Sequence, residues 1–138
     1  MIAATELRLV VVTPETTLID QNVQSIRFPL FDGQFGVLPG RAPAVGRLGT
    51  GELQFETGSG TERYFIDGGF LQIKGHIVTL LTNVATPAEG IRLDEAKAEL
   101  ATAKAMPVAT DEQYAAALSA QQSARSKIAL KDSGHSRH

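Results

Sequence analysis

The sequence predicts a mixed fold in which an antiparallel β-sandwich is followed by an antiparallel helical hairpin. Over about the first 85 residues, apolar and polar side chains alternate, and turn residues recur roughly every 8 to 12 positions. After Thr86-Pro87-Ala88-Glu89-Gly90 the chain becomes rich in alanine and charge. With 138 residues the chain is long enough for one sizeable core and an appendage, which fits this division.

The strand prediction rests on alternation, which is clearest at the first segment. Leu7, Leu9 and Val11 share one face, while Glu6 and Arg8 lie on the other, as expected of a half-buried antiparallel strand. We expect about ten short strands, arranged as a sandwich or flattened barrel. Further strand-like segments are Thr16–Ile19, Val23–Phe28, Gln34–Leu38, Gly51–Glu56, Thr61–Asp67, Phe70–Lys74 and Ile77–Thr82.

Three short glycine-containing segments predict tight turns between these strands. They are Asp32-Gly33, Gly58-Ser59-Gly60 and Lys74-Gly75-His76, and their glycines supply the positive φ that tight hairpins demand. A fourth glycine segment, Asp67-Gly68-Gly69, lies between two strand patterns and no helix start follows it. We therefore interpret it as a backbone bend rather than a catalytic acid beside a phosphate-binding loop.

The second part of the chain predicts two helices with a short connection. We place a β-sandwich domain at 1–87 and a helical hairpin at 91–138, the latter ending in an aperiodic tail. Asp94 is a candidate cap for a helix that runs to about Met106, where Pro107 follows. Thr110 and Gln113 have the spacing of a capping box that opens the second helix.

Thin apolar stripes should hold the two helices together. We expect one stripe of Leu93, Ala96, Leu100 and Ala103, and a second of Tyr114, Leu118, Gln121 and Ile128. Alanine buries few methylenes, at roughly 0.8 kcal/mol each, so the hairpin should rearrange easily. Composition alone leaves two interpretations open: a conformational switch, and a docked pair of helices that only stabilises the fold.

Composition and motif content exclude several functions. The formal charge is −2, which gives no field that attracts nucleic acid, and cysteine is absent, which removes thiolate chemistry and disulfides. No apolar run approaches the ~20 residues of a spanning helix, and no export signal precedes the first strand, so we expect only indirect membrane association. Nucleophile elbows, phosphate-binding loops and zinc-binding helices are missing, and His76, His135 and His138 lack a carboxylate cluster. We expect no enzyme activity and no metal.

A set of motifs then resembles one known family. The loop Gly36-Val37-Leu38-Pro39-Gly40-Arg41-Ala42-Pro43 is followed by Gly51-Glu52-Leu53, Gly68-Gly69-Phe70 and Val78-Thr79-Leu80-Leu81. This order is similar to the epsilon subunit of bacterial F-type ATP synthases, where the loop reads Gly-x-x-Pro-Gly-His-Ala-Pro. Arg41 departs from the pattern by replacing the usual histidine.

The resemblance implies a subunit of the central stalk that couples proton transport to ATP synthesis without catalysis of its own. Its partners would be the gamma subunit, the ring of c subunits, and the alpha/beta catalytic head, which the hairpin would reach to inhibit ATP hydrolysis. It would lie peripherally on the cytoplasmic face of the bacterial inner membrane. The surface implied to face gamma and the c-ring is the loop of Gln34, Gly36, Pro39, Gly40, Arg41 and Pro43.

The hairpin resembles the regulatory hairpin that binds ATP in some family members, which makes a regulatory ATP the sole cofactor to consider. Leu93-Asp94-Glu95-Ala96-Lys97-Ala98 is similar to the family pattern Ile/Leu-Asp-x-x-Arg-Ala, with lysine in place of arginine. Lysine does not reproduce the planar fork of a guanidinium. The candidate nucleotide-binding residues are Asp94, Lys97, Ala98, Lys104, Arg125, Lys127 and Lys131. The rival hypothesis is a free-standing ligand-binding sandwich with a helical lid.

Overall fold

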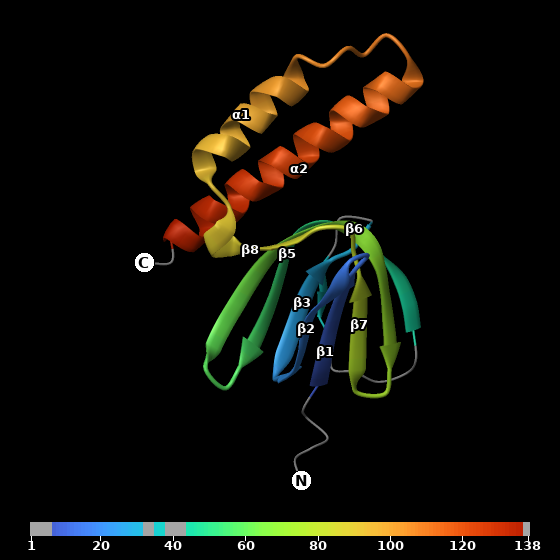
Figure 1. Ribbon diagram of the computed structural model, residues 1–138, viewed down its shortest axis with the longest axis vertical. Coiled ribbons are helices and arrows are strands. Elements are labelled where there is room, and N and C mark those ends of the chain that lie inside the picture. Colours follow the sequence, from blue (N-terminus) through green and yellow to red (C-terminus); the bar gives the residue numbers. More distant parts are fainter. Residues whose placement is uncertain (1–6, 32–34, 38–43, 137–138) are drawn as a thin grey trace. The chain divides into compact units, whose positions relative to one another are not determined.

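The computed structural model describes residues 7–31, 35–37 and 44–136, without the side chains of 35–37, 44 and 133–136. The chain divides into two compact units, Met1–Thr86 and Pro87–His138. The first unit carries the sheet and the second the hairpin (Figure 1). In the described residues no helix is both long and apolar enough to cross a membrane.

Strands β1 to β8 form one sheet in the described residues, in the order β2-β1-β7-β6-β5-β3-β4, with β8 pairing β6 off this path. Strand β1 runs parallel to β7, and the other neighbours along the path are antiparallel. The sheet is not closed, since β2 and β4 lie at its two ends, so the flattened-barrel form of the prediction is wrong. The strands are β1 (Leu7–Thr13), β2 (Thr16–Val23), β3 (Ser25–Pro29), β4 (Phe35–Val37), β5 (Ala44–Thr57), β6 (Gly60–Lys74), β7 (Ile77–Leu81) and β8 (Ala85–Pro87).

A single apolar core confirms the sandwich. Leu9 of β1, Leu80 of β7, Phe55 of β5 and Ile26 of β3 are all almost fully buried in one cluster. These strands stand at distant places in the sheet order, so the sheet must fold over on itself to bring them together. Each such side chain contributes roughly 1.5–3 kcal/mol on burial, which makes this core the main source of stability.

The structure has fewer and longer strands than the expected ten or so: eight strands lie in the described residues. The segments predicted at Thr61–Asp67 and Phe70–Lys74 are one strand, β6, of 15 residues. It continues through Gly68 and Gly69, whose φ angles are 78° and 123°, so the glycines bend the strand without ending it. The hairpin turns at Gly58-Ser59 and Gly75-His76 are confirmed, with Gly75 at φ 63°.

In the second unit a single 3₁₀ turn, η2 (Ala88–Gly90), leads to α1 (Leu93–Lys104) and α2 (Asp111–Ser136), which run side by side in opposite directions (Figure 1). The capping box is confirmed, because Thr110 Oγ1 accepts from Gln113 N at 3.0 Å and Gln113 Oε1 accepts from Thr110 N at 3.3 Å. Asp94 is not the cap of α1. Arg92 holds that position, its side chain makes no capping hydrogen bond to the backbone of the first turn, and Asp94 lies inside that turn.

Alanines form the seam between the two helices. Ala96 and Ala103 of α1 are buried, as are Ala117 and Ala124 of α2. The predicted α2 stripe is therefore partly wrong: Gln121 and Ile128 are half-buried, whereas Tyr114 and Leu118 are 55% and 50% exposed. The α1 stripe holds, with Leu93 and Leu100 half-buried beside the two alanines. Small side chains let the helices approach closely and leave Tyr114 and Leu118 on the outer flank of α2, whereas Leu130 near its end is buried.

Candidate functional site

An apolar row crosses the outer face of the sheet. Val12 of β1 stands opposite Leu81 of β7, Leu81 opposite Phe70 of β6, and Phe70 opposite Arg47 of β5. Phe70 is 54% exposed, Leu81 46%, and Val12 is half-buried. We call Val12, Leu81 and Phe70 the apolar strip. Its neighbours along each strand, such as Val11, Leu80 and Leu71, point to the core, so the strip lies on the opposite face.

A stacked cation ends the row at β5. The Arg47 guanidinium lies 3.9 Å from the centre of the Phe31 ring, and both residues are exposed. The Phe31 N–H donates to the Arg47 carbonyl at 3.0 Å, which fixes the two backbones together. A cation over an aromatic face is stabilised by about 0.5–1 kcal/mol at such exposed sites. The strip therefore ends in a positioned positive charge.

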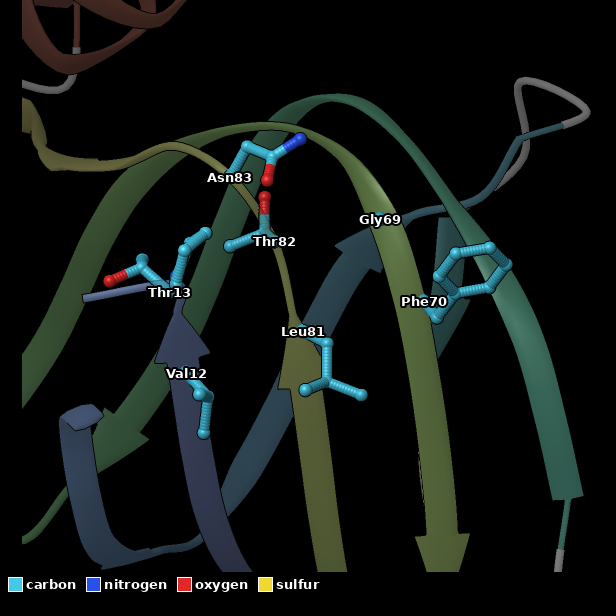
Figure 2. A pocket seen from close by; sticks show the side chains of 8 residues that line it. Val12, Thr13, Gly69, Phe70, Leu81, Thr82 and Asn83 are labelled. Carbon is cyan, nitrogen blue, oxygen red and sulfur yellow. The ribbon is translucent and has the colours of Figure 1, made fainter. Parts of the chain in front are cut away.

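A pocket of about 280 Å³ opens along the strip, beside the ends of β1 and β7 (Figure 2). Figure 2 shows its walls: Val12 and Thr13 on β1, Gly69 and Phe70 on β6, and Leu81 with Thr82 and Asn83 at the end of β7. Pro14 completes the lining. The Thr82 hydroxyl donates to the Gly68 carbonyl at 2.7 Å, and the Thr82 N–H donates to the Val12 carbonyl at 3.0 Å. Hence the hydroxyl and the backbone N–H of Thr82 both donate hydrogen bonds within the sheet.

Gly69 shapes the floor of this pocket. A Cβ at this position would lie 2.0 Å from the Leu81 carbonyl oxygen and 2.9 Å from the Thr82 Cα. The backbone of β6 thus approaches the end of β7 more closely than any side chain permits. The sequence predicts a bend at Gly68-Gly69. This bend shapes the pocket and sets the position of Phe70, which follows it in β6.

Of the residues predicted to bind nucleotide, Asp94 has two partners at the start of α1, Arg92 and Glu95. One carboxylate oxygen accepts from the Glu95 N–H at 2.9 Å, and the other lies 3.5 Å from Arg92 Nη2. The hydrogen bond from Arg92 lowers the pKa of Asp94 below its ordinary value, and the Glu95 N–H lowers it further. Both side chains are exposed, so solvent screens this pair and it adds little stability.

The predicted cations are spread around the hairpin. Lys127 Nζ bridges the helices to Glu99 Oε1 at 3.0 Å. Because each residue turns a helix by about 100°, Lys97 points roughly 200° away from Glu99, whereas Lys97 and Lys104 share one side. Lys97, Ala98, Lys104 and Arg125 are exposed, and Lys131 is half-buried. Lys97 and Lys104 are the cations that the structure brings to one side of α1, and Lys127 serves a different side.

The predicted partner-facing loop is represented only by Gly36, which pairs with Phe28 in the short strand β4. Gln34, Pro39, Gly40, Arg41 and Pro43 lie outside the described residues. In the described part of the chain, no group of three or more histidine or acidic side chains is placed to hold a metal ion.

The apolar strip is not among the sites that the sequence predicts, although the sequence carries a signal for it. Val10-Val11-Val12 and Leu80-Leu81 place apolar side chains at consecutive positions, where alternation demands a polar residue on one face. Such an excess of apolar residues indicates that these strands are buried on both faces, one face against the core and the other against a further surface. The register of the sheet is needed to show that the surplus residues from β1, β7 and β6 fall in one row.

An open β-sandwich with an apolar outer strip, joined to a charged helical hairpin, defines a protein whose exposed surfaces suit contact with other proteins. The chain belongs to the ATP synthase delta/epsilon family: the family model for the ATP synthase delta/epsilon chain β-sandwich domain matches residues 6–88. It is 50% identical over 107 residues to the ATP synthase epsilon chain of Rhodopirellula baltica, covering 78% of this chain and 84% of that one. The epsilon chain of Solibacter usitatus is 37% identical over 128 residues, covering 91% and 96%.

Solved structures share the fold at lower identity. A chain of the Euglena gracilis mitochondrial ATP synthase (OSCP/F1/c-ring, rotational state 1) matches with a TM-score of 0.78 at 22% identity, covering 91% of this chain and 81% of that one. A chain of the central stalk and c-ring of Tetrahymena thermophila mitochondrial ATP synthase matches with a TM-score of 0.70 at 14% identity, covering 91% and 96%. At these identities the likeness concerns the fold.

Proposed function

We propose that the chain is a non-catalytic subunit of the ATP synthase central stalk, which joins the gamma subunit to the c-ring on the cytoplasmic face of the membrane. Membership of the epsilon chain family supports this assignment. The observation that carries it is the apolar strip, because half-exposed Phe70 and Leu81 side chains in adjacent register mark a surface that another protein covers.

The strip is suited to a subunit interface for a further reason. Val12, Leu81 and Phe70 lie on strands with neighbours on both sides, so the sheet holds their backbones rigidly. A rigid apolar centre beside a polar rim is the arrangement typical of protein interfaces. The loop around Pro39 and Gly40, which the family resemblance assigns to the c-ring side, would complete the link to the ring.

Phe70→Glu should abolish most of this docking. We expect recovery of gamma and c subunits with the tagged variant to fall at least about tenfold, since a buried unpaired carboxylate costs more than 1.4 kcal/mol. Quantitative mass spectrometry of complexes purified from solubilised membranes measures the recovery.

Gln72→Glu is the matched control, because Gln72 is exposed on the same strand and face two residues away. It should recover close to the wild-type amounts. Equal recovery with Phe70→Glu and the control would refute the assignment of the strip to this interface.

The rival hypothesis of a free-standing ligand-binding sandwich has one supporting observation, the pocket beside the strip. Its volume of about 280 Å³ lies just below the roughly 300–1,000 Å³ of typical small-molecule sites. A wild-type chain that purifies without other ATP synthase subunits, under conditions that preserve the remaining complex, would favour this rival.

We further propose that ATP is a regulatory ligand of the hairpin rather than a substrate. Support comes from the Asp94 to Ala98 segment that resembles the family pattern, and from Lys97 and Lys104, which share one side of α1. Because Asp94 is an anion that repels phosphate, the phosphates would depend mainly on these lysines.

Isothermal calorimetry of the full chain with millimolar ATP should give a saturable heat, and Lys97→Ala should weaken the affinity about three- to tenfold through loss of one charge-assisted contact. Lys74→Ala, an exposed lysine of the sheet, is the control. No heat with the wild-type chain, or identical curves for Lys97→Ala and wild type, would exclude this ligand role.

A further inference from the structure

The outer flank of α2 leaves two large apolar side chains in contact with water. Tyr114 and Leu118 are each at least half exposed, although the alanines of the seam on the same helix are buried. Beside them lies a shallow groove, which is lined by Leu118, Gln122, Arg125, Ser126 and Ala129. The flank therefore offers a projecting aromatic ring at Tyr114 and a groove further along the same helix.

Opposite charges stand at equal distances on either side of Leu118. Asp111 precedes it by seven residues, and Arg125 follows it by seven. Seven residues turn an α-helix by about 700°, so both charged side chains lie within about 20° of the direction of Leu118. Both are exposed, and among the ion pairs of the described residues neither takes part in one. The sequence between them has one other charge, Glu112, which is turned about 100° from Asp111.

This flank is complementary to a second copy of itself that runs in the opposite direction. With Leu118 on a two-fold axis, residues equally far before and after it face each other, so Asp111 meets Arg125 of the second copy, and the axis repeats the pair. Tyr114 falls opposite Gln122, which lines the groove. A parallel pair in register would instead place Asp111 on Asp111 and Arg125 on Arg125, which like charges disfavour.

We propose that the free chain forms an antiparallel homodimer through the outer flank of α2, with Leu118 packed on Leu118 at the axis and an Asp111–Arg125 pair on each side. Each Tyr114 ring lies in the groove of the other copy. The proposal stands on this helix and does not rest on the stalk function. A chain paired in this way cannot present the same flank to another subunit, so the dimer is a state of the chain outside the assembled complex.

The contact is short, so the dimer should be weak. The segment from Asp111 to Arg125 is about 21 Å long at 1.5 Å per residue. Stable interfaces bury about 1,200 Å² or more in total, and one helix face of this length buries less. We expect a dissociation constant on the order of 100 μM, which sedimentation equilibrium of the full-length chain between about 10 and 1,000 μM measures. A chain that stays monomeric over this range would overturn the proposal.

Charge reversal tests the antiparallel register. Arg125→Asp alone and Asp111→Arg alone each bring like charges together at both ends, and should raise the dissociation constant about five- to tenfold. An equimolar mixture of the two variants pairs arginine with aspartate at both ends of a heterodimer, and should associate as the wild type does. Glu112→Arg is the matched control for Asp111→Arg, since it makes the same change one residue away on another side of the helix. Circular dichroism verifies that the helices stay folded. A mixture that associates no better than the separate variants would refute the register.

A single cysteine tests the axis. The chain has no cysteine, so the Leu118→Cys variant carries one thiol. Mild oxidation should link two copies of this variant, because the two positions face each other across the axis. Ala116→Cys is the matched control, exposed but turned about 200° from Leu118, and should give at least about tenfold less linked dimer. Equal yields from the two variants would contradict the proposed axis.

The apolar strip of the sheet offers another route to self-association, and Phe70→Glu distinguishes the two. If α2 forms the contact, this variant should sediment as the wild type does, whereas Arg125→Asp should not. Loss of the dimer with Phe70→Glu but not with Arg125→Asp would place the contact on the sheet and overturn the proposal.

Discussion

Gly69→Ala is expected to destabilise the sheet by about 2–6 kcal/mol, a large share of the roughly 5–15 kcal/mol that a domain of this size has. Gly69 has a φ of 123°, a region that costs a residue with a Cβ about 1–3 kcal/mol. Its Cβ would also lie 2.0 Å from the Leu81 carbonyl oxygen, and moving β6 away from β7 costs about 1–3 kcal/mol more. Urea unfolding followed by circular dichroism measures the difference.

Two other glycines provide a graded control for this result. Gly75 has a φ of 63° and open space around its Cβ position, so Gly75→Ala should cost only about 1–2 kcal/mol of backbone strain. Gly58 has open space and no positive φ, so Gly58→Ala should be neutral or slightly stabilising. The explanation by close approach fails if Gly69→Ala costs no more than Gly75→Ala.

The same glycines show how far the sequence determines the strands. Gly75 and Gly58 were predicted as turns and are turns, because short polar connections between two strand patterns leave few alternatives. Gly68 and Gly69 were predicted as a bend between separate strands, and the strand continues through them. A glycine permits both outcomes, and the choice depends on the pairing of Gly69 with Leu48 and of Asp67 with Thr50, which are distant in the sequence.

The helices show a different limit of prediction. The capping box at Thr110 is local and was predicted correctly, since all its atoms lie within one turn. The predicted stripe of α2 comprises Tyr114, Leu118, Gln121 and Ile128, but the buried seam runs along Ala117 and Ala124. Side-chain size suggests which face is apolar, whereas the face that packs is decided by how closely the neighbouring helix can approach.

The candidate site likewise has one part that short sequence motifs predict and another that depends on how distant strands pair. The resemblance to the family rests on short motifs that can be recognised in the sequence alone, and the family match over residues 6–88 confirms the resemblance. The apolar strip depends on the register of β1, β7, β6 and β5, which no local pattern specifies. The nucleotide-binding set stays a prediction, and its cations prove to be distributed over more than one side of the hairpin.

Removal of the hairpin, in a chain that ends at Gly90, is expected to raise ATP hydrolysis by the assembled complex several-fold. An alanine seam gives the hairpin little stability of its own, since each buried methyl contributes only about 0.8 kcal/mol. Its second helix also presents exposed Tyr114 and Leu118, with Arg125 lining a shallow groove beside Leu118. A loosely held helix with an apolar and basic outer flank is suited to bind the catalytic head and block ATP hydrolysis.

The measurement is steady-state ATP hydrolysis by purified complexes that contain the full-length chain or the chain ending at Gly90. Leu118→Ala with Tyr114→Ala in the full-length chain separates the outer flank from the hairpin as a whole, and should reproduce most of the increase. Ala115→Ser is the matched control on an exposed position of the same helix, and should leave the rate unchanged. Equal rates with and without the hairpin, at equal recovery of the other subunits, would exclude inhibition and leave the hairpin a structural role.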